Sequence, residues 1–171
     1  MIWSTPQRVF DKLNDEFEFQ IDVCADPDNA KCGEYYTRQR GLHEEWTGMC
    51  FMNPPYGRGK LIDPWIAKAH QVAFRSEGSV VCLIPARNNP PWWHDYVMQA
   101  TEIRFVRSKL SFAGESKGVP FWGNAIVVFS GGEVGPVGST WWRPYVSSWD
   151  QPGAKRARVR DPERSFTGAR L

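Results

Sequence analysis

The chain has 171 residues, of which 42% are hydrophobic and 23% are charged, and its formal net charge is +2. These values are ordinary for one globular domain, and so small a net charge gives no argument by itself for nucleic-acid binding. The first residues lack the basic-then-apolar plan of a signal peptide, and no apolar run could span a membrane. We therefore expect a cytoplasmic protein without membrane contact. The four cysteines have no CxxC spacing, which favours buried free thiols over disulfides and predicts no metal site.

The N-terminal segment predicts a helix followed by a strand. Thr5 suits the N-cap of a helix, and Pro6 suits its first position, where a missing N–H costs nothing. Apolar residues then recur at helical spacing: Val9, Phe10, Leu13 and Phe17. The segment from Phe17 to Cys24 alternates apolar and polar residues, which is typical of a strand.

This strand runs into a polar segment from Asp22 to Cys32, which we expect to form a turn. Asp22, Asp26 and Asn29 offer acceptor oxygens, whereas Cys24 and Ala25 are small enough for a ligand to approach the backbone. Asp and Asn side chains also bond their own backbone in turns, so a purely structural turn is an equal alternative at each position.

The most informative stretch is Asn53-Pro54-Pro55-Tyr56-Gly57. Apolar residues from Met49 to Met52 predict a short buried strand that ends at Asn53. The two prolines fix φ at about −65° and remove two backbone donors, so the chain leaves the strand along a rigid path. Backbone carbonyls can then point outward beside the Asn53 amide, and Tyr56 adds a flat ring. This loop favours a planar guest that carries an amino group, at the strand end where open α/β sheets bind ligands.

The remaining segments predict further helices and strands, then a tail. One helix has its apolar face at Ile62, Trp65, Ile66, Ala69, Val72 and Ala73, and another starts at Pro90. Strands are expected at Ser79 to Ile84, at Glu102 to Val106 with a continuation to Phe112, and at Asn124 to Phe129. We expect an α/β domain at residues 1–149, in which helices flank a mostly parallel sheet whose last strands run either way. A basic, disordered tail is expected at residues 150–171, either solubilising or attracted to phosphate.

The Asn-Pro-Pro-Tyr stretch resembles the catalytic motif of the S-adenosylmethionine (AdoMet)-dependent amino-methyltransferases, which include N6-adenine DNA methyltransferases. The order of the motifs resembles the compact phage-type Dam-like DNA N6-adenine methyltransferases from about Trp3 to Phe129. That order runs through Thr5-Pro6, Asp22 to Asp26, Asn29 to Cys32, Tyr35 to Thr37, Gly41-Leu42, Trp46 to Gly48 and Asn53 to Gly57. The glycine-rich GxG turn usual after the first strand of this fold is missing here.

The resemblance implies a Rossmann-like methyltransferase fold and a site-specific enzyme that methylates N6 of a flipped adenine in DNA, marking DNA against restriction in a phage or bacterial cell. It implies catalytic roles for Asn53, Pro54, Pro55 and Tyr56. AdoMet contacts are expected at Thr5, Pro6, Asp22, Cys24, Ala25, Asp26, Asn29 and Asn53. Contacts with the base or with DNA are expected at Tyr56, Phe112, Arg58, Lys60 and Arg87. For Phe112 a core position, and for Arg87 a solvated side chain, are equal alternatives.

Two other functions fit the same residues. The first is methylation of RNA or of a protein glutamine, although those enzymes usually carry the glycine-rich loop. The second is a DNA-binding module that has lost catalysis, which the intact Asn53-to-Tyr56 motif disfavours. Binding of AdoMet would separate an enzyme from such a module.

Overall fold

The computed structural model describes residues 4–56, 61–107, 109–112, 122–131 and 138–142. It is an α/β structure with three α-helices, one short 3-10 helix and seven strands among these residues. The helices are α1 (Gln7–Phe17), α2 (Asp63–Phe74) and α3 (Pro91–Asp95), and the 3-10 helix is η1 (Val97–Gln99). The strands are β1 (Ile21–Ala25), β2 (Glu34–Thr37), β3 (Gly48–Met52), β4 (Gly78–Pro85), β5 (Glu102–Val106), β6 (Asn124–Phe129) and β7 (Gly138–Trp142).

All seven strands form one sheet in the order β2-β1-β3-β4-β6-β5-β7. The pairs β1–β2, β1–β3, β3–β4 and β5–β7 are parallel, whereas β6 runs antiparallel to both β4 and β5. The expected mostly parallel sheet is confirmed, and its antiparallel strand is β6. The carboxyl ends of β1, β3, β4 and β5 therefore meet at one edge, together with the amino end of β6.

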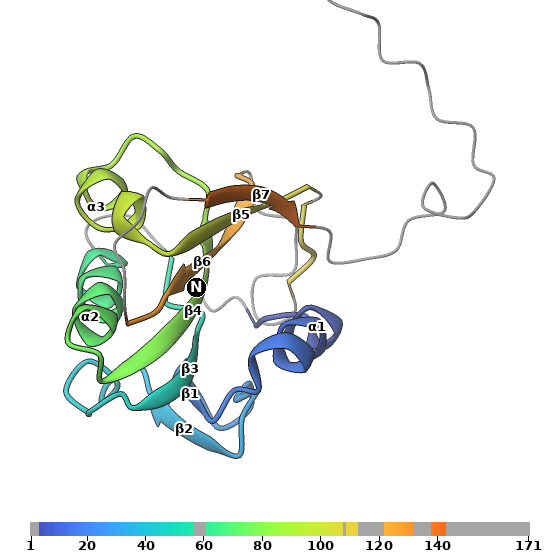
Figure 1. The fold of residues 1–171 in the computed structure, drawn as a ribbon. Coiled ribbons are helices and arrows are strands. Elements are labelled where there is room, and N and C mark those ends of the chain that lie inside the picture. The colour runs from blue at the N-terminus through green and yellow to red at the C-terminus, as the bar shows by residue number, and fades with distance from the viewer. Residues whose placement is uncertain (1–3, 57–60, 108, 113–121, 132–137, 143–171) are drawn as a thin grey trace, which may run out of the picture.

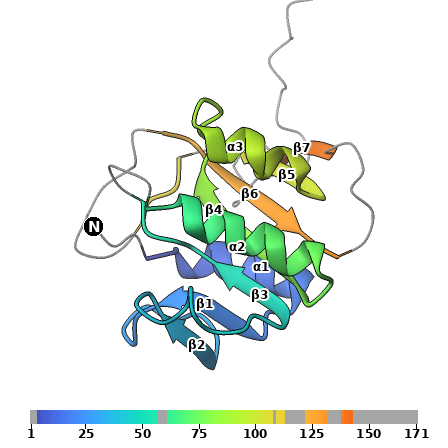
Figure 2. The same cartoon turned by 90° about the vertical axis from the view of Figure 1, so that its left-hand side faces the viewer.

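The helices cover both faces of the sheet. In Figures 1 and 2, α2 and α3 lie on one face and α1 lies on the other. The α2 side buries the residues that the helical pattern predicted, Trp65, Ile66, Ala69, Val72 and Ala73. On the α1 side, Val9, Phe10 and Leu13 pack with Phe51 and Leu83 of the sheet. β4 is buried from Val80 to Pro85, as expected of a strand covered on both faces.

Three expected boundaries are wrong. Thr5 does not cap α1, because Pro6 in an extended conformation is the N-cap and its carbonyl accepts from Val9 and Phe10. The first strand starts at Ile21 instead of Phe17, since α1 continues to Phe17 and Glu18 ends it with a φ of 53°. β5 ends at Val106 and does not continue to Phe112.

The cysteines are unpaired, as predicted. All four are free thiols, and Cys24, Cys50 and Cys82 are buried.

The basic tail from residue 150 lies outside the described residues, as do Arg58 and Lys60. Within the described part of the chain, no helix is both long enough and apolar enough to cross a bilayer.

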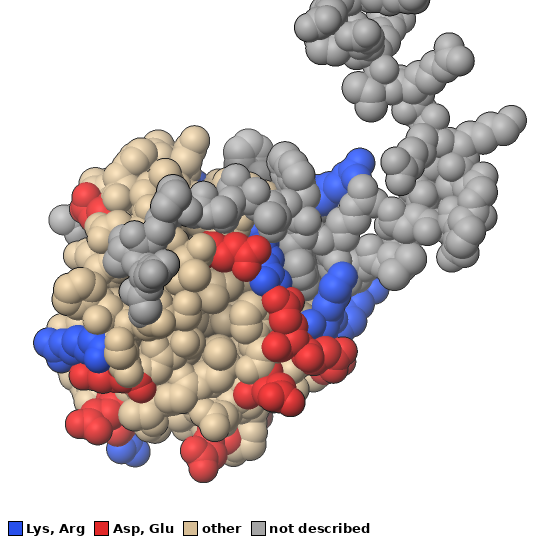
Figure 3. Space-filling model, in the orientation of Figure 1, with Lys and Arg blue, Asp and Glu red and all other residues tan. Residues whose placement is uncertain are grey.

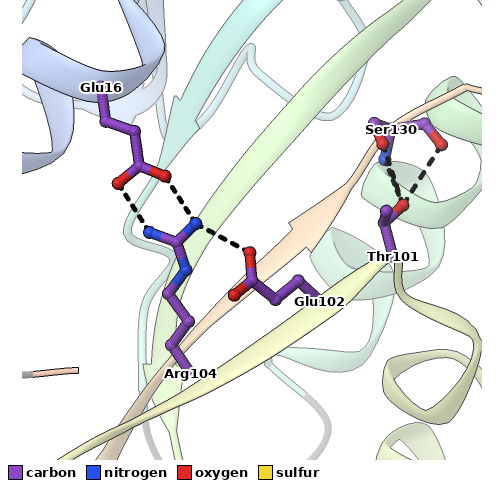
Figure 4. A network of polar contacts seen from close by, with 5 residues as sticks. All are labelled: Glu16, Thr101, Glu102, Arg104 and Ser130. Carbon is purple, nitrogen blue, oxygen red and sulfur yellow. Dashed lines mark hydrogen bonds and ion pairs between the residues drawn. The ribbon is translucent and has the colours of Figure 1, made fainter. Parts of the chain in front are cut away.

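A charged network ties α1 to β5 on the face opposite α2. Arg104 of β5 donates from Nη1 to Glu16 Oε2 at 2.7 Å and from Nη2 to Glu16 Oε1 at 2.5 Å (Figure 4). Its Nη2 also donates to Glu102 Oε2 at 2.7 Å. The Arg104 side chain is only 13% exposed, so this bidentate ion pair is better shielded from water than an ion pair on the surface. It joins two elements 88 residues apart in sequence, which holds α1 against the sheet.

Gly41 packs where no side chain fits, so Gly41→Ala is expected to lower the free energy of unfolding by about 2 kcal/mol or more. A Cβ there would lie 2.3 Å from the Val23 carbonyl oxygen and 2.9 Å from the Trp65 ring. The Val23 carbonyl belongs to the backbone of β1, which cannot move away without disturbing the sheet. Chemical denaturation would measure the effect, with Gly33→Ala as the control, because a Cβ at Gly33 meets nothing within 4 Å. Equal stability of the two variants would contradict this packing argument.

Candidate active site

A cleft opens at the carboxyl edge of the sheet, between β1 and β3. The chain leaves β1 to form β2 on one side and later returns to form β3 on the other side. Such a point, where the strand order reverses, is the usual ligand site of an open α/β sheet. The cleft is lined by Ser4, Thr5, Asp22, Cys24, Asn29, Lys31, Arg38, Asn53, Pro54 and Pro55.

A chain of hydrogen bonds fixes the Asn53 side chain at the end of β3. Its Nδ2 donates to Thr5 Oγ1 at 2.9 Å, and its Oδ1 accepts from the Tyr56 hydroxyl at 2.6 Å. Thr5 is 4% exposed, so it is held in place ahead of α1. The two prolines after Asn53 carry no N–H, so neither of them can donate a hydrogen bond to the Asn53 or the Pro54 carbonyl. The amide of Asn53 is thus oriented by its own chain before any ligand binds.

Tyr56 lies deeper than its expected stacking role suggests. The residue is 4% exposed, and its hydroxyl also lies 2.5 Å from the Leu83 carbonyl oxygen. Burial raises the pKa of Tyr56 well above its ordinary value, so the hydroxyl keeps its proton and donates to one of these two acceptors. Its ring meets Phe112 edge-on, with 6.5 Å between centroids. The stacking of a base on Tyr56 or Phe112 stays a prediction, and it requires a face of one of these buried rings to become uncovered.

Asp22 places a buried carboxylate in the cleft. The residue is 3% exposed, its Oδ1 accepts from Cys24 N at 3.3 Å, and its Oδ2 accepts from Lys31 N at 3.1 Å. Burial outweighs these donors and raises the pKa of Asp22 from 3.8 to about 6. A carboxylate kept in such a place at a cost in stability is typical of a ligand-binding group.

The turn from Asp26 to Asn29 is partly held by its own side chains. Asn29 Oδ1 accepts from Asp26 N at 2.9 Å, and the Asp26 carbonyl accepts from the backbone N–H of Asn29 and Ala30. The Asp26 carboxylate forms an ion pair with Arg38 at 2.9 Å. The structural alternative therefore holds for these local contacts, although the Asn29 side chain also lines the cleft.

The structure gathers most of the expected cofactor residues, but not all. Thr5, Asp22, Cys24, Asn29 and Asn53 line one cleft together with Pro54 and Pro55, whereas Pro6, Ala25 and Asp26 do not line it. Three further residues line the cleft without having been predicted to do so: Ser4, Lys31 and Arg38. Arg38 follows the edge strand β2 directly, so a strand prediction there would have placed it at the same edge. Lys31 gave no separate signal, because its position depends on the path of the turn.

The cleft carries both signs of charge. Lys31 Nζ donates to Gln7 Oε1 at 2.9 Å, and burial lowers the pKa of Lys31. Arg38 lines the cleft as well as Asp22, and it pairs with Asp26. Such a site suits a zwitterionic guest, since one carboxylate and two cations face the same space.

Arg87 lies at the same edge of the sheet, after β4. It is exposed, and its guanidinium lies 5.8 Å from the centre of the Trp122 ring. This position is open to solvent and to a phosphate, so both readings of Arg87 stand. In this contact the guanidinium lies near an aromatic ring and not near a carboxylate.

Two comparisons with known proteins show what this chain is similar to. The sequence model of the family described as "DNA N-6-adenine-methyltransferase (Dam)" matches residues 1–129. A 63-residue segment is 40% identical to a protein of Escherichia coli (strain K12) named "Putative methyltransferase YfdM". That segment covers 32% of this chain and 69% of the Escherichia coli protein. All residues that line the cleft lie within the range that the family model matches.

Proposed function

The chain belongs to the DNA N-6-adenine-methyltransferase (Dam) family, and from this premise we propose that it transfers a methyl group from AdoMet to the N6 amino group of adenine in DNA. The observation that carries the proposal is the Asn53 amide, oriented by Thr5 and Tyr56 at the edge of a cleft of mixed charge. The strand order around that cleft supports a Rossmann-like methyltransferase fold as part of the proposal.

The residues of the cleft fit AdoMet by charge. The ionised carboxylate of Asp22 suits the methionine amino group or the ribose hydroxyls. The cations of Lys31 and Arg38 suit the methionine carboxylate, with the Thr5 hydroxyl as a further polar contact. When bound, AdoMet supplies a methyl group that its sulfonium activates. The buried state of Asp22 favours this fit, since a positive partner offsets the cost of its charge.

Asn53 and Pro54 act on the amino group of the base. The lone pair of an adenine amino group is delocalised into the ring, which makes the nitrogen a weak nucleophile. Acceptors for its two hydrogens, the Asn53 Oδ1 and the Pro54 carbonyl, favour a pyramidal nitrogen with an available lone pair. Because the Asn53 amide is already oriented, little reorganisation accompanies the reaction. The amino group must leave the duplex to reach these acceptors, so the adenine is flipped out.

We expect DNA to bind at the carboxyl edge of the sheet, because Asn53 lies there. The arrow of β3 in Figure 2 points to the left-hand side, which is the far side of Figure 1. The face in Figure 3 is therefore the opposite one, and acidic side chains gather on it beside α1 with basic ones between them. The described residues of that face form no continuous basic surface for phosphates.

Calorimetry and methyl transfer together test the proposal. We expect the purified protein to bind AdoMet and its demethylated product, and to transfer a labelled methyl group to adenine in DNA. RNA and glutamine-containing peptides, tested in parallel, should accept no label. Binding of neither compound at millimolar concentration would overturn the enzyme proposal. Transfer to RNA or peptide but not to DNA would overturn the substrate.

A further inference from the structure

The position of the cleft determines from which side the target base approaches, if the proposed function holds. Along the carboxyl edge the strands run β2, β1, β3, β4, β6. The cleft occupies the β2–β1–β3 part, with Asn53 at its border. Transfer of a methyl group needs the donor and the attacking nitrogen on opposite sides of that methyl group, in line. The base must then face the other part of the edge, above β3, β4 and β6.

A buried amide without a partner lies on this side. Asn124 is the first residue of β6 and is paired in register with Pro85, the last residue of β4. It is 1% exposed, and among the residues that the structure describes neither its Oδ1 nor its Nδ2 has a hydrogen-bond partner. Burying an amide in this way costs about 1–3 kcal/mol. Such a cost is expected where a ligand supplies the missing partner.

Asn124 and Asn53 point to the same face of the sheet. Side chains two apart on a strand share a face. Asn53 follows Phe51 by two positions and Asn124 precedes Ile126 by two, and both Phe51 and Ile126 pack on the α1 side. Phe112 packs in that same cluster and meets the ring of Tyr56. The α1 face of this edge therefore brings together Phe112 and two amides, and the ring of Tyr56, which belongs to the core of the α2 side, meets Phe112 edge-on.

We propose that Asn124 recognises the target base of the proposed reaction, by donating from Nδ2 to the ring nitrogen N1 or N7 beside the amino group. Adenine presents an acceptor at each of these positions, and amide side chains suit the donor–acceptor pattern of its edge. Since Asn53 and Pro54 accept both amino hydrogens, the ring nitrogens are what Asn124 can still bind. Guanine carries a hydrogen at N1 and a carbonyl at position 6, so it would leave the acceptors of Asn53 and Pro54 unpaired.

Asn124→Leu tests the role of the amide, on DNA whose target adenine is natural, 1-deaza or 7-deaza. Wild type should lose about tenfold in kcat/KM on one of the two analogues, as expected for one lost base contact. Asn124→Leu should lose about tenfold on natural adenine and show less than a twofold further loss on that same analogue. Its Tm should equal or exceed that of wild type, because no orphaned amide is then buried. Asn89→Leu, which changes an exposed residue near the same edge, should behave as wild type.

The outcomes separate this inference from the proposed function. If wild type methylates both analogues as well as adenine, or if Asn124→Leu keeps the full analogue penalty, the role of Asn124 is wrong while adenine methylation stands. If Asn124→Leu is less stable than wild type, the Asn124 amide of the wild type has a structural partner, and the inference is overturned. The wild-type comparison of the analogues needs no variant, so it decides the matter even if Asn124→Leu does not fold. Absence of any adenine methylation by wild type overturns both proposals.

Discussion

Replacing Asn53 by alanine is expected to slow single-turnover methyl transfer by about a hundredfold or more. The variant loses the acceptor that pairs with an amino hydrogen as the nitrogen becomes pyramidal, so the loss falls mainly on kcat. Folding should change little, because Asn53 follows β3 and lies outside its pairing with β4, which ends at Met52. Rapid-quench methylation would measure the rate, circular dichroism the fold, and calorimetry the binding of AdoMet. A rate within threefold of wild type would show that Asn53 has another role.

Two substitutions of Thr5 test whether its hydroxyl orients Asn53. Its hydroxyl accepts from Asn53 Nδ2, so Thr5→Val should leave the amide free to turn, whereas Thr5→Ser keeps the acceptor. We expect a loss of about tenfold in kcat for the valine variant and near wild-type kcat for the serine variant. A loss in the serine variant with no loss in the valine variant would indicate that the methyl group of Thr5, and not its hydroxyl, matters to the site.

Tyr56 should tolerate phenylalanine better than alanine, but less well than a stacking role alone predicts. A stacking role needs only the ring. The structure adds two acceptors for its hydroxyl, Asn53 Oδ1 and the Leu83 carbonyl, which Phe would leave without this donor. The Phe variant therefore keeps the buried ring and loses part of the orientation of Asn53.

Much of the fold follows from local patterns along the chain. α2 was predictable because its apolar residues recur at helical spacing, and β4 because an uninterrupted apolar run indicates burial on both faces. The short strand β2 was not predicted, since Glu34–Thr37 at the edge of the sheet is half exposed and has no alternating pattern. The cap of α1 was misassigned by one residue, because Thr5 instead bonds a side chain 48 positions away.

The site was predictable where the backbone itself carries the signal. Two prolines after an apolar strand marked Asn53, and acidic residues in and after the end of the first strand marked Asp22. Lys31 and Arg38 could not be assigned, because charged residues in a polar loop look the same whether they face a cleft or solvent. Asn124 gave no signal for a similar reason: its burial and lack of a partner depend on strand pairing with β4, which follows from tertiary structure.

AdoMet affinity is expected to fall by up to about tenfold for each pH unit below 6, because the binding form of Asp22 is the carboxylate. The pKa of Asp22 in the folded protein is about 6, raised by burial, so protonation removes the negative charge from the cleft at pH 5. Between pH 5 and 7 the α-amino group of AdoMet stays protonated, since its ordinary pKa is about 8. Asp22→Asn should weaken binding at pH 7.5 by at least about tenfold and remove this pH dependence.

The same carboxylate is expected to affect stability in the opposite direction. Because folding raises the pKa of Asp22 from 3.8 to about 6, the folded protein holds this proton more tightly than the unfolded chain does. The stability that Asp22 contributes is therefore full below about pH 4 and is lost as the pH rises to 6, by at most about 3 kcal/mol. Asp22→Asn, which cannot ionise, should be more stable than wild type at pH 7.5 while binding AdoMet more weakly. Asp28→Asn is the matched control, because Asp28 lies in the same turn but is exposed.

Calorimetry from pH 5 to 8 and thermal denaturation over the same range would measure both effects. A wild-type affinity that stays level across this range, or an Asp22→Asn variant that binds as tightly as wild type, would remove Asp22 from the cofactor site. Weaker binding with no gain in stability would instead mean that the hydrogen bonds from Cys24 N and Lys31 N offset the cost of burying this charge. A gain in stability together with lost affinity is the result that a functional buried charge predicts, because the protein then retains an unfavourable group for the ligand that it binds.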